Sequence, residues 1–456
     1  MDTIRADAGS ADVAVQETLQ MSISKFRRRT VTRAKDAARY SSVAGGVAFA
    51  RSLLGSRLSK NPVGRASHFL QAYRFTFRQF WLQRLAPRIS GIQQLTDDEL
   101  STLNRRVLEW ISQNGPLDRT VIVKAPGSGG ERGVIVSFPE PNWLRLVLDS
   151  KAAEYIGKRY SLILTAGWSP LDYSLLEAVL RRITGTIFIQ ACNRSELNKI
   201  HAFSSRLVCL PTLGCDWINP DLYSPVPRSQ RPIDLTMVAN WAPFKRHWHL
   251  FDALRQMPPG LRVQLIGQPD AGFTVERVKQ QAADYGLRQQ IEFFDRLLVE
   301  DVQDHLTQAK VSIILSRHEG YCGAVTESMF ADTPVGLLSD AYIGSKDYIN
   351  AQTGVLLPHR NLAQALMAFI ARSTEFRPRE WAIKNISFRA SVAKLNAILR
   401  EHALRENCPW SEDIAEFCWR PYPTLLKMNQ RLREAADDLT HRFPQTFGSG
   451  LCNALP

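Results

Sequence analysis

This chain of 456 residues lacks long apolar runs. No stretch approaches the roughly eighteen consecutive apolar residues that a membrane-spanning helix needs, so none is predicted. The acidic residues near the N-terminus also do not resemble a secretion signal. The expected compartment is therefore the cytoplasm.

Cysteine pairs are missing as well. The seven cysteines are scattered without any Cys-x-x-Cys pair, and their number is odd. These features argue against a disulfide framework and a zinc cluster, so we interpret the thiols as reduced and mostly structural. His247 and His249 could ligate a metal, but two histidines without carboxylate or cysteine partners are more typical of a polar helix start. No metal or other cofactor is expected.

Extremes of composition are absent too. Apolar residues make up 45% of the chain and charged residues 22%, which is typical of a soluble globular protein and excludes disordered or collagen-like classes. The length is too great for one ordinary core and suits two domains with appended arms.

Acidic residues are scarce in one region. Residues 21–90 contain fifteen Lys or Arg against one acid, Asp36, which gives +14, whereas the whole chain carries +13. The basic charge therefore belongs to an N-terminal arm, residues 1–90. An anionic membrane surface would attract this charge. Nucleic acid would also attract it, but no recognised nucleic-acid-binding module accompanies the arm, and nucleic acid is not expected as a partner.

The end of this arm, HFLQAYRFTFRQFWLQRLAP, carries large apolar side chains near helical spacing. These residues are Phe69, Leu70, Tyr73, Phe77, Phe80, Trp81 and Leu85. Because arginines flank them, the segment fits an interfacial helix on a membrane. A helix packed on the body of the protein fits equally well, so both interpretations stay open.

Beyond the arm, short β-rich runs alternate with helical patterns, which indicates α/β architecture. TVIVK, RGVIVSF, YSLILTA and GTIFIQ predict strands of a first sheet, and LEAVLRR predicts a crossover helix. The Pro-rich segment 211–232 is typical of an interdomain connection. A second series, DLTMVAN, RVQLIG, IEFF, VSIILS and PVGLLS, predicts a second doubly wound sheet.

The predicted division therefore has four parts. Residues 1–90 form the arm, 91–230 a first Rossmann-like domain, 231–400 a second, and 401–456 C-terminal helices with a loose tail.

The candidate chemistry follows the strands of the second sheet, because ligands bind beyond the carboxyl ends of parallel strands. After VSIILS, a loop carries Glu319 and Gly320, and a helix beginning near Gly323 carries Glu327. Two carboxylates there could accept hydrogen bonds from paired sugar hydroxyls. Chance alone would supply the spacing of the two glutamates, so the strand, turn and helix around them carry the prediction.

Two further strand ends offer residues to the same crevice. NWAPFKRHWH places Lys245 and Arg246 after the first strand, where cations could neutralise a departing diphosphate, and Lys245 is the better candidate. Gly267 ends the next strand and is a weaker indication, because glycine is common in such turns.

The stretch from Asp234 to about Leu366 resembles the donor domain of GT-B retaining glycosyltransferases with a Glu-x7-Glu signature, known as family 4 or glycosyl transferases group 1. The matching motifs are Ala239-Asn240 with Lys245, Gly267, Ser316-Arg-His-Glu319-Gly320-Tyr321 and Glu327-Ser-Met-Phe-Ala-Asp-Thr-Pro-Val335. Asn240 replaces the family's arginine, Cys322 is inserted before the second glycine of the turn, and Asp332 replaces a glycine.

The resemblance implies a GT-B fold, in which two Rossmann-like domains face a cleft. It also implies metal-independent transfer of a sugar from a UDP- or GDP-linked donor to a hydroxyl with retention. In this family Lys245 would bind the diphosphate, Glu319 the sugar and Glu327 the ribose. The remaining donor-binding candidates are Asn240, Arg246, Gly267, Gly320, Tyr321 and Gly323. No Asp-x-Asp occurs, which removes the metal clamp of the other glycosyltransferase architecture.

The acceptor side is harder to place. A loop with Gly129, Gly130 and Arg132 is a candidate, with a plain surface turn as the alternative. A saccharide or lipid-linked acceptor in cell-surface polysaccharide or glycolipid synthesis is expected, with the arm holding the enzyme at the inner face of the membrane. The rival hypotheses are an epimerase or phosphorylase on the same fold, and a catalytically silent module that binds a membrane or partner.

Overall fold

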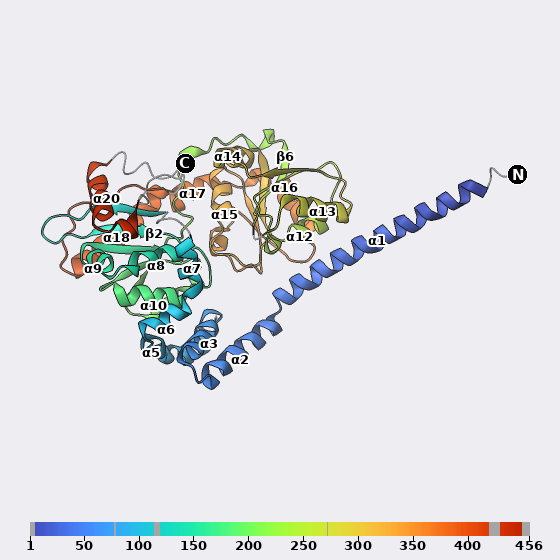
Figure 1. Ribbon diagram of the computed structural model, residues 1–456. Coiled ribbons are helices and arrows are strands. Elements are labelled where there is room, and N and C mark those ends of the chain that lie inside the picture. The colour runs from blue at the N-terminus through green and yellow to red at the C-terminus, as the bar shows by residue number, and fades with distance from the viewer. Residues whose placement is uncertain (1–4, 77–78, 114–118, 271, 419–428, 449–456) are drawn as a thin grey trace.

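The protein folds into two α/β domains, each with its own sheet and core (Figure 1). The computed structural model describes residues 5–76, 79–113, 119–270, 272–418 and 429–448. Each sheet is mostly or wholly parallel, and helices cover the strands. The predicted GT-B plan of two parallel-sheet domains is therefore confirmed.

The first sheet contains the four strands predicted from the apolar runs, together with a short fifth. Its strands are β1 Thr120–Lys124, β2 Gly133–Ser137, β3 Tyr160–Thr165, β4 Ile187–Gln190 and β5 Leu207–Cys209. Their order is β1-β2-β3-β4-β5, with β1 antiparallel to β2 and the others parallel. Nearly every residue of β1 to β4 is buried, because both faces of the sheet are covered.

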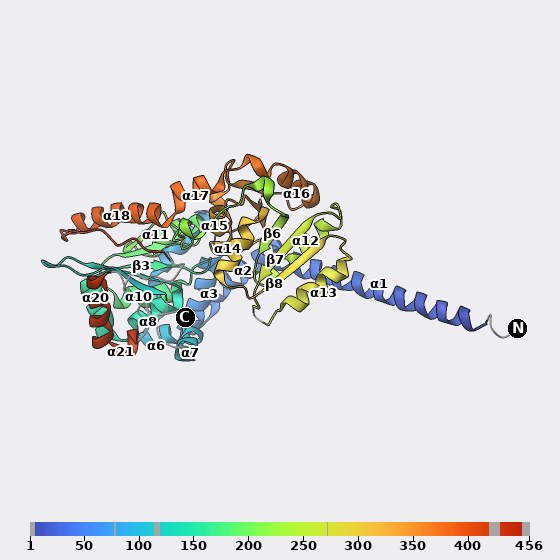
Figure 2. The same ribbon diagram turned by 90° about the horizontal axis from the view of Figure 1, so that it is seen from above.

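The helices between these strands are α8 Glu140–Leu148, α9 Ser150–Arg159, α10 Tyr173–Arg182 and α11 Leu197–Phe203. Sequential strand order with right-handed crossovers places all of them on one face of the sheet. The opposite face packs against α18 (Phe388–Arg405), whose Leu395 contacts the side of the sheet that carries Val134 and Ile163. Figure 2 shows α18 on one side of β3, and α8 and α10 on the other. The expectation of a doubly wound first sheet is thus corrected: it is singly wound, and a late helix closes it.

The second sheet is doubly wound, as predicted. Its strands are β6 Ile233–Val238, β7 Arg262–Gly267, β8 Gln290–Asp295, β9 Ala309–Ile314, β10 Val335–Leu338 and β11 Gly354–Leu357. All pair in parallel in the order β11-β10-β9-β6-β7-β8, so the direction of winding reverses between β6 and β9. The accompanying helices are α12 His247–Leu254, α13 Val275–Tyr285, α14 Val299–Thr307, α15 Gly323–Phe330 and α16 Leu362–Ala371.

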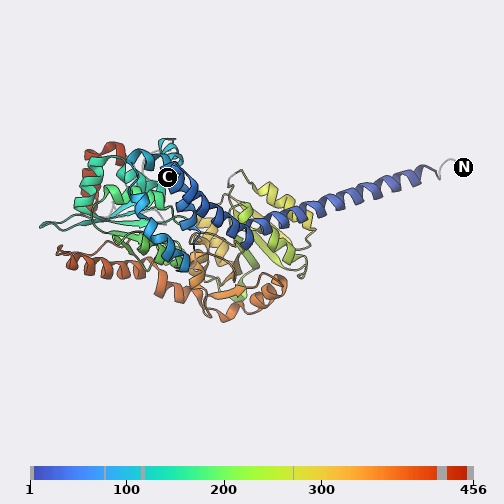
Figure 3. The same cartoon turned by 90° about the horizontal axis from the view of Figure 1, so that it is seen from below.

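The N-terminal arm is helical and contacts both domains. It comprises α1 Arg5–Arg39, α2 Ser42–Leu58, α3 Pro62–Arg74, α4 Gln79–Leu85 and the start of α5 Ser90–Gln93, followed by α6 Asp97–Leu103 and α7 Arg105–Gln113. Helix α1 packs on α13 of the second domain, and Figure 3 shows α2 and the later part of α1 crossing the body while the earlier part of α1 extends away from it. Helix α3 joins the core of the first domain.

The aromatic residues at the end of the arm mostly pack on the body. Phe69 and Tyr73 are buried, and the Tyr73 hydroxyl donates to the Lys199 carbonyl over 2.6 Å. Leu70 and Leu85 are buried beside them, whereas Phe80 is exposed. The four buried side chains belong to the first-domain core and cannot form a membrane-facing surface. Phe77 lies outside the described residues.

The last described helices pack on the first domain. After α17 (Pro378–Ile386) and α18, α20 (Gln430–Arg442) and α21 (Pro444–Phe447) add apolar side chains to its core. The 3-10 helices are η1 Ala86–Arg88, η2 Arg194–Glu196, η3 Pro220–Leu222, η4 Arg228–Gln230, η5 Pro243–Lys245, η6 Gly344–Tyr348 and η7 Ser373–Glu375. Within the described ranges, no helix is both long enough and apolar enough to cross a membrane.

Candidate active site

The candidate site lies where β6 and β9 end side by side. These neighbouring strands form the switch point of the second sheet, where connections leave to opposite faces and a crevice is expected. Lys245 ends η5, in the connection after β6, and Glu319 lies in the loop after β9. The strand pairing therefore brings together two residues that are far apart in sequence.

Glu319 and Lys245 form a buried ion pair. The Lys245 Nζ donates to Glu319 Oε2 over 2.7 Å, and the two side chains are 13% and 6% exposed. Burial lowers the pKa of Lys245, but the Glu319 carboxylate outweighs it and the net pKa is raised, so the ammonium keeps its charge. Glu319 Oε1 is buried and accepts no hydrogen bond from any N–H or O–H group in the part of the chain that the structure describes.

The glycine turn after Glu319 leads directly into α15. Cys322 caps this helix in the left-handed conformation, with φ of 56°, and Gly323 is the first helical residue. A Cβ on Gly323 would lie 3.9 Å from Glu327 Oε1, so the half-buried Glu327 carboxylate lies beside the first turn of α15. A carboxylate and backbone amides thus share this end of the helix, as the sequence predicts.

Gly320 and Tyr321 face the first domain. A Cβ on Gly320 would lie 2.8 Å from the Gly167 carbonyl oxygen, and the Tyr321 ring lies 6.3 Å from that of Phe138. Tyr321 packs against the cores of both domains. Both residues therefore take part in the interdomain contact, and their contact with the donor stays a prediction.

Gly267 and Asn240 lie in adjoining turns after β7 and β6. A Cβ on Gly267 would lie 2.3 Å from the Ala239 carbonyl oxygen and 3.0 Å from the Trp241 ring, so only glycine fits there without a backbone shift. Asn240 is half-buried in the same turn. The indole N–H of Trp241 donates to Asp295 Oδ1 over 2.6 Å, which ties this turn to the end of β8.

Arg246 does not share the site with Lys245, contrary to prediction. Its side chain is fully buried and its guanidinium donates to both carboxylate oxygens of Asp36 in α1, over 2.9 and 3.0 Å. A further hydrogen bond goes to the Leu315 carbonyl. With these contacts, the guanidinium ties the arm to the second domain.

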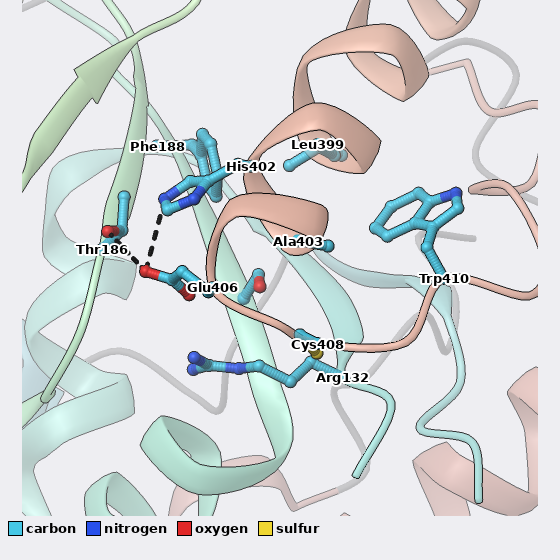
Figure 4. Close-up of a pocket in the computed structure, with 10 residues that line it drawn as sticks. Arg132, Thr186, Phe188, Leu399, His402, Ala403, Glu406, Cys408 and Trp410 are labelled. Carbon is cyan, nitrogen blue, oxygen red and sulfur yellow. Dashed lines mark hydrogen bonds and ion pairs between the residues drawn. The ribbon is translucent and has the colours of Figure 1, made fainter. Parts of the chain in front are cut away.

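The predicted acceptor residues lie at the wrong end of the first sheet. Because β1 and β2 are antiparallel, the hairpin with Gly129 and Gly130 meets the beginnings of the parallel strands rather than their carboxyl ends. Arg132 donates to the carbonyls of Gly157 and Tyr160, both over 2.6 Å. It lines a cavity of about 10 Å³ beside α18, too small for a sugar (Figure 4).

The loops that do face the second domain follow the ends of β2, β3 and β4. Glu140, which follows β2, accepts from the amides of Gly167 and Trp168 over 3.0 and 3.3 Å. Burial raises its pKa to about 7, although these hydrogen bonds oppose the effect. Sequence reasoning missed this carboxylate, although its place just after a strand was a usable signal.

Side chains from both domains also interlock at this boundary. His318 Nε2 lies 2.6 Å from the Ser169 carbonyl, and the His318 ring stacks on Tyr342 at 4.9 Å. The Tyr342 hydroxyl lies 2.8 Å from Ser195 Oγ. Trp168 meets Phe244 edge to face, at 6.1 Å. The boundary therefore closes around the loops next to Lys245 and Glu319.

The histidines considered as metal ligands are buried. Burial lowers the pKa values of His247 and His249 to about 3, so both rings stay neutral. Across the described residues, no group of three or more His, Cys, Asp or Glu side chains has an arrangement that could hold a metal ion.

Comparison with protein families gives a match for the second domain. Residues 224–384 match the family model of glycosyl transferases group 1. The matched range contains Lys245, Glu319 and Glu327 together with the strands that position them. We therefore call residues 224–384 the group 1 domain.

Solved structures give matches at low identity. A sucrose-phosphate synthase from Thermosynechococcus elongatus shares 17% identity, with 56% of this chain and 72% of that chain covered and a TM-score of 0.45. Anabaena HepE in complex with UDP and glucose shares 16%, covering 56% and 76%, with a TM-score of 0.43. A glycosyltransferase from Rickettsia africae shares 15%, covering 57% and 80%, with a TM-score of 0.43. Comparison with curated protein sequences gave no match.

Proposed function

We propose that the protein transfers a sugar from a nucleoside diphosphate donor to an acceptor hydroxyl, with retention of the anomeric configuration. One observation carries the proposal. Within the group 1 domain, Glu319 is buried at the sheet switch point with one oxygen on Lys245 and the other without an N–H or O–H donor among the residues that the structure describes. A buried acceptor of this kind is costly unless a ligand hydroxyl completes it.

The proposed roles follow from charge and position. Lys245 supplies a fixed positive charge that stabilises the diphosphate as the bond from the anomeric carbon to the phosphate oxygen breaks and the electron pair leaves with the diphosphate. The acceptor oxygen then bonds to the anomeric carbon from the same face, and its proton passes to an oxygen of the departing diphosphate. Glu319 accepts a hydrogen bond from a sugar hydroxyl, and Glu327, beside the first turn of α15, accepts from the ribose.

The acceptor is proposed to approach from the first domain, past the carboxyl ends of β2, β3 and β4. The loop 167–169 already touches the group 1 domain at Gly320, so an acceptor held there would meet the donor directly. We propose a saccharide or lipid-linked acceptor, and a reaction that needs no metal ion. We propose that this transfer is one step in the synthesis of a membrane-linked polysaccharide or glycolipid.

Donor hydrolysis tests the proposal. The protein is incubated with a panel of UDP- and GDP-sugars, and nucleoside diphosphate release is measured together with the nucleotide-dependent rise in melting temperature. We expect Lys245→Ala to lower kcat/KM by about a hundredfold to a thousandfold. Glu327→Ala should raise KM by about tenfold or more, since it removes one charge-assisted hydrogen bond.

Lys310→Ala is the matched control. Lys310 also forms a 2.7 Å ion pair, with Asp234, but it lies at the beginning of β9, at the opposite end of the sheet. Its loss should leave donor turnover unchanged. Absence of both turnover and nucleotide-dependent stabilisation would contradict the proposal and favour a silent binding module. Epimerised sugar or sugar phosphate as the product would identify an epimerase or a phosphorylase.

A further inference from the structure

Helix α2 presents an apolar stripe to solvent. Val43, Val47, Leu54 and Leu58 are between 56% and 76% exposed. At 100° per residue, these positions lie within about 60° of one another around the helix axis. The stripe is therefore a continuous line along one face of the helix.

The opposite face of α2 already packs on the protein. Phe49 contacts Trp81 at 5.3 Å, and Ser52 and Ser56 are buried. The guanidinium of Arg88 donates to Ser56 Oγ over 3.1 Å. The inward face of α2 therefore makes the contacts with the protein, and the outward stripe contributes nothing to them. A surface helix with apolar residues on both faces needs a binding partner for its outward face.

Cations surround the stripe and acids are absent. Arg51, Arg57 and Lys60 are exposed on or just after α2. The sequence contains no Asp or Glu from Ala37 to Thr96. Helix α1 continues the pattern, because Phe26 and Val31 are exposed among further basic residues. The partner must therefore offer both negative charge and an apolar interior.

We propose that the outward face of α2 lies on an anionic lipid bilayer, with the apolar stripe among the acyl chains and the arginines at the phosphates. Nucleic acid would match the cations but not a line of valines and leucines. A second copy would match the stripe, but a two-fold interface would bring the same arginines face to face. The lipid-facing surface is thus α2 rather than the aromatic segment that ends the arm.

Vesicle co-sedimentation tests this proposal independently of donor chemistry, since no nucleotide sugar is present. The full chain is mixed with vesicles of phosphatidylcholine alone, or of equal parts phosphatidylcholine and phosphatidylglycerol. We expect binding only to the anionic vesicles, and weaker binding as salt increases. The double variant Leu54→Gln, Leu58→Gln should weaken binding by about tenfold or more, because two large apolar side chains no longer leave water for the acyl chains.

Two other exposed leucines provide matched controls. Leu298 is 70% exposed and Leu404 63% exposed, and both lie outside the arm. The double variant Leu298→Gln, Leu404→Gln should bind anionic vesicles as the wild type does. Arg51→Gln with Arg57→Gln should weaken binding and reduce its salt dependence.

Four results would overturn the proposal. The first is equal binding by the wild type and the α2 leucine variant, and the second is equal binding to both kinds of vesicle. The third is a wild-type dimer in light scattering that the α2 leucine variant converts to a monomer without any vesicle binding, which would assign the stripe to a second copy. Retention on nucleic acid but not on anionic vesicles would likewise reject the lipid surface.

Discussion

Two buried glutamates lie on opposite sides of the domain boundary, and their carboxylates are held in different ways. Glu140 follows β2 of the first domain, and Glu319 follows β9 of the group 1 domain. Glu140 accepts from two backbone amides and forms no ion pair with any of the described residues. Glu319 is paired with Lys245 and keeps one oxygen without an N–H or O–H donor among the described residues.

This difference separates a structural carboxylate from one suited to a ligand. Burial raises the pKa of Glu140 to about 7, and both of its oxygens are used to hold the loop that carries Gly167 and Trp168. Glu319 lies beside an ammonium that stays charged, and its remaining oxygen can accept from a donor hydroxyl. The same residue type after a strand end can therefore position a loop or bind substrate, depending on its partners.

The largest expected effect is on turnover. Glu319→Gln should lower nucleoside diphosphate release by about a hundredfold to a thousandfold, because Lys245 loses its counter-charge and the sugar loses a charged acceptor. Glu140→Gln should lower it by less than about tenfold, since the amide oxygen still accepts one hydrogen bond from the loop. Equal losses in the two variants would show that both carboxylates act on substrate.

The second effect is on the free energy of unfolding, through the ion pair that joins α1 to the group 1 domain. Asp36→Ala should lower the free energy of unfolding by about 3–5 kcal/mol, because it leaves the buried Arg246 guanidinium without its partner. Urea unfolding measures this change. Arg33→Ala is the matched control: Arg33 lies on the same helix, but its pair with Asp252 is largely exposed and should contribute less than about 1 kcal/mol. If Asp36→Ala lowers the free energy of unfolding as little as the control does, the contact between α1 and Arg246 does not stabilise the group 1 domain.

The third effect is on the pH dependence of stability, to which the raised pKa of Glu140 contributes. The unfolded Glu140 carboxyl ionises near its ordinary pKa of 4.5, whereas the folded one holds its proton up to about pH 7. Its contribution to stability is thus fully present below about pH 4.5 and is lost as the pH rises through 7, by at most about 3 kcal/mol. Between about pH 5 and about pH 8, the difference in unfolding free energy between the wild type and Glu140→Gln should therefore shift in favour of the variant, as measured by urea unfolding of both proteins. Asp216, whose pKa burial raises to about 6, and His247 and His249, whose pKa values burial lowers to about 3, add the same pH dependence to both proteins, and it cancels in this difference.

The sequence was sufficient for the strands and for the central pair. Continuous apolar runs predict β6 and β9, and the rule that ligands follow parallel strands brings Lys245 and Glu319 together. Arg246 was misplaced because its partner, Asp36, is 210 residues away and no local pattern reveals the pairing. The hairpin with Gly129 was misplaced because an antiparallel first strand, which local propensity does not distinguish from a parallel one, turns it to the other end of the sheet.

The interdomain contacts were also beyond local reasoning. Tyr321 looks like a donor-loop residue in sequence, but in the structure it is half-buried and packs against the cores of both domains. Glu140 was overlooked because a glutamate at a helix start is common. Only the tertiary structure shows that its carboxylate accepts a hydrogen bond from the loop after β3. Both cases depend on tertiary placement, which composition and periodicity do not contain.

The smallest expected effect probes the contact between the two sides. Gly320→Ala should cost about 1–3 kcal/mol, because its Cβ would lie 2.8 Å from the Gly167 carbonyl oxygen and would push away the loop that Glu140 holds. Gly323→Ala, three residues later, meets nothing closer than 3.9 Å and should be neutral in stability. If thermal unfolding shows equal values for the two variants, the glycine contact does not hold the domains together. A loss confined to Gly320→Ala, and reduced when Glu140→Gln is also present, would show that the two sides are mechanically coupled through this loop.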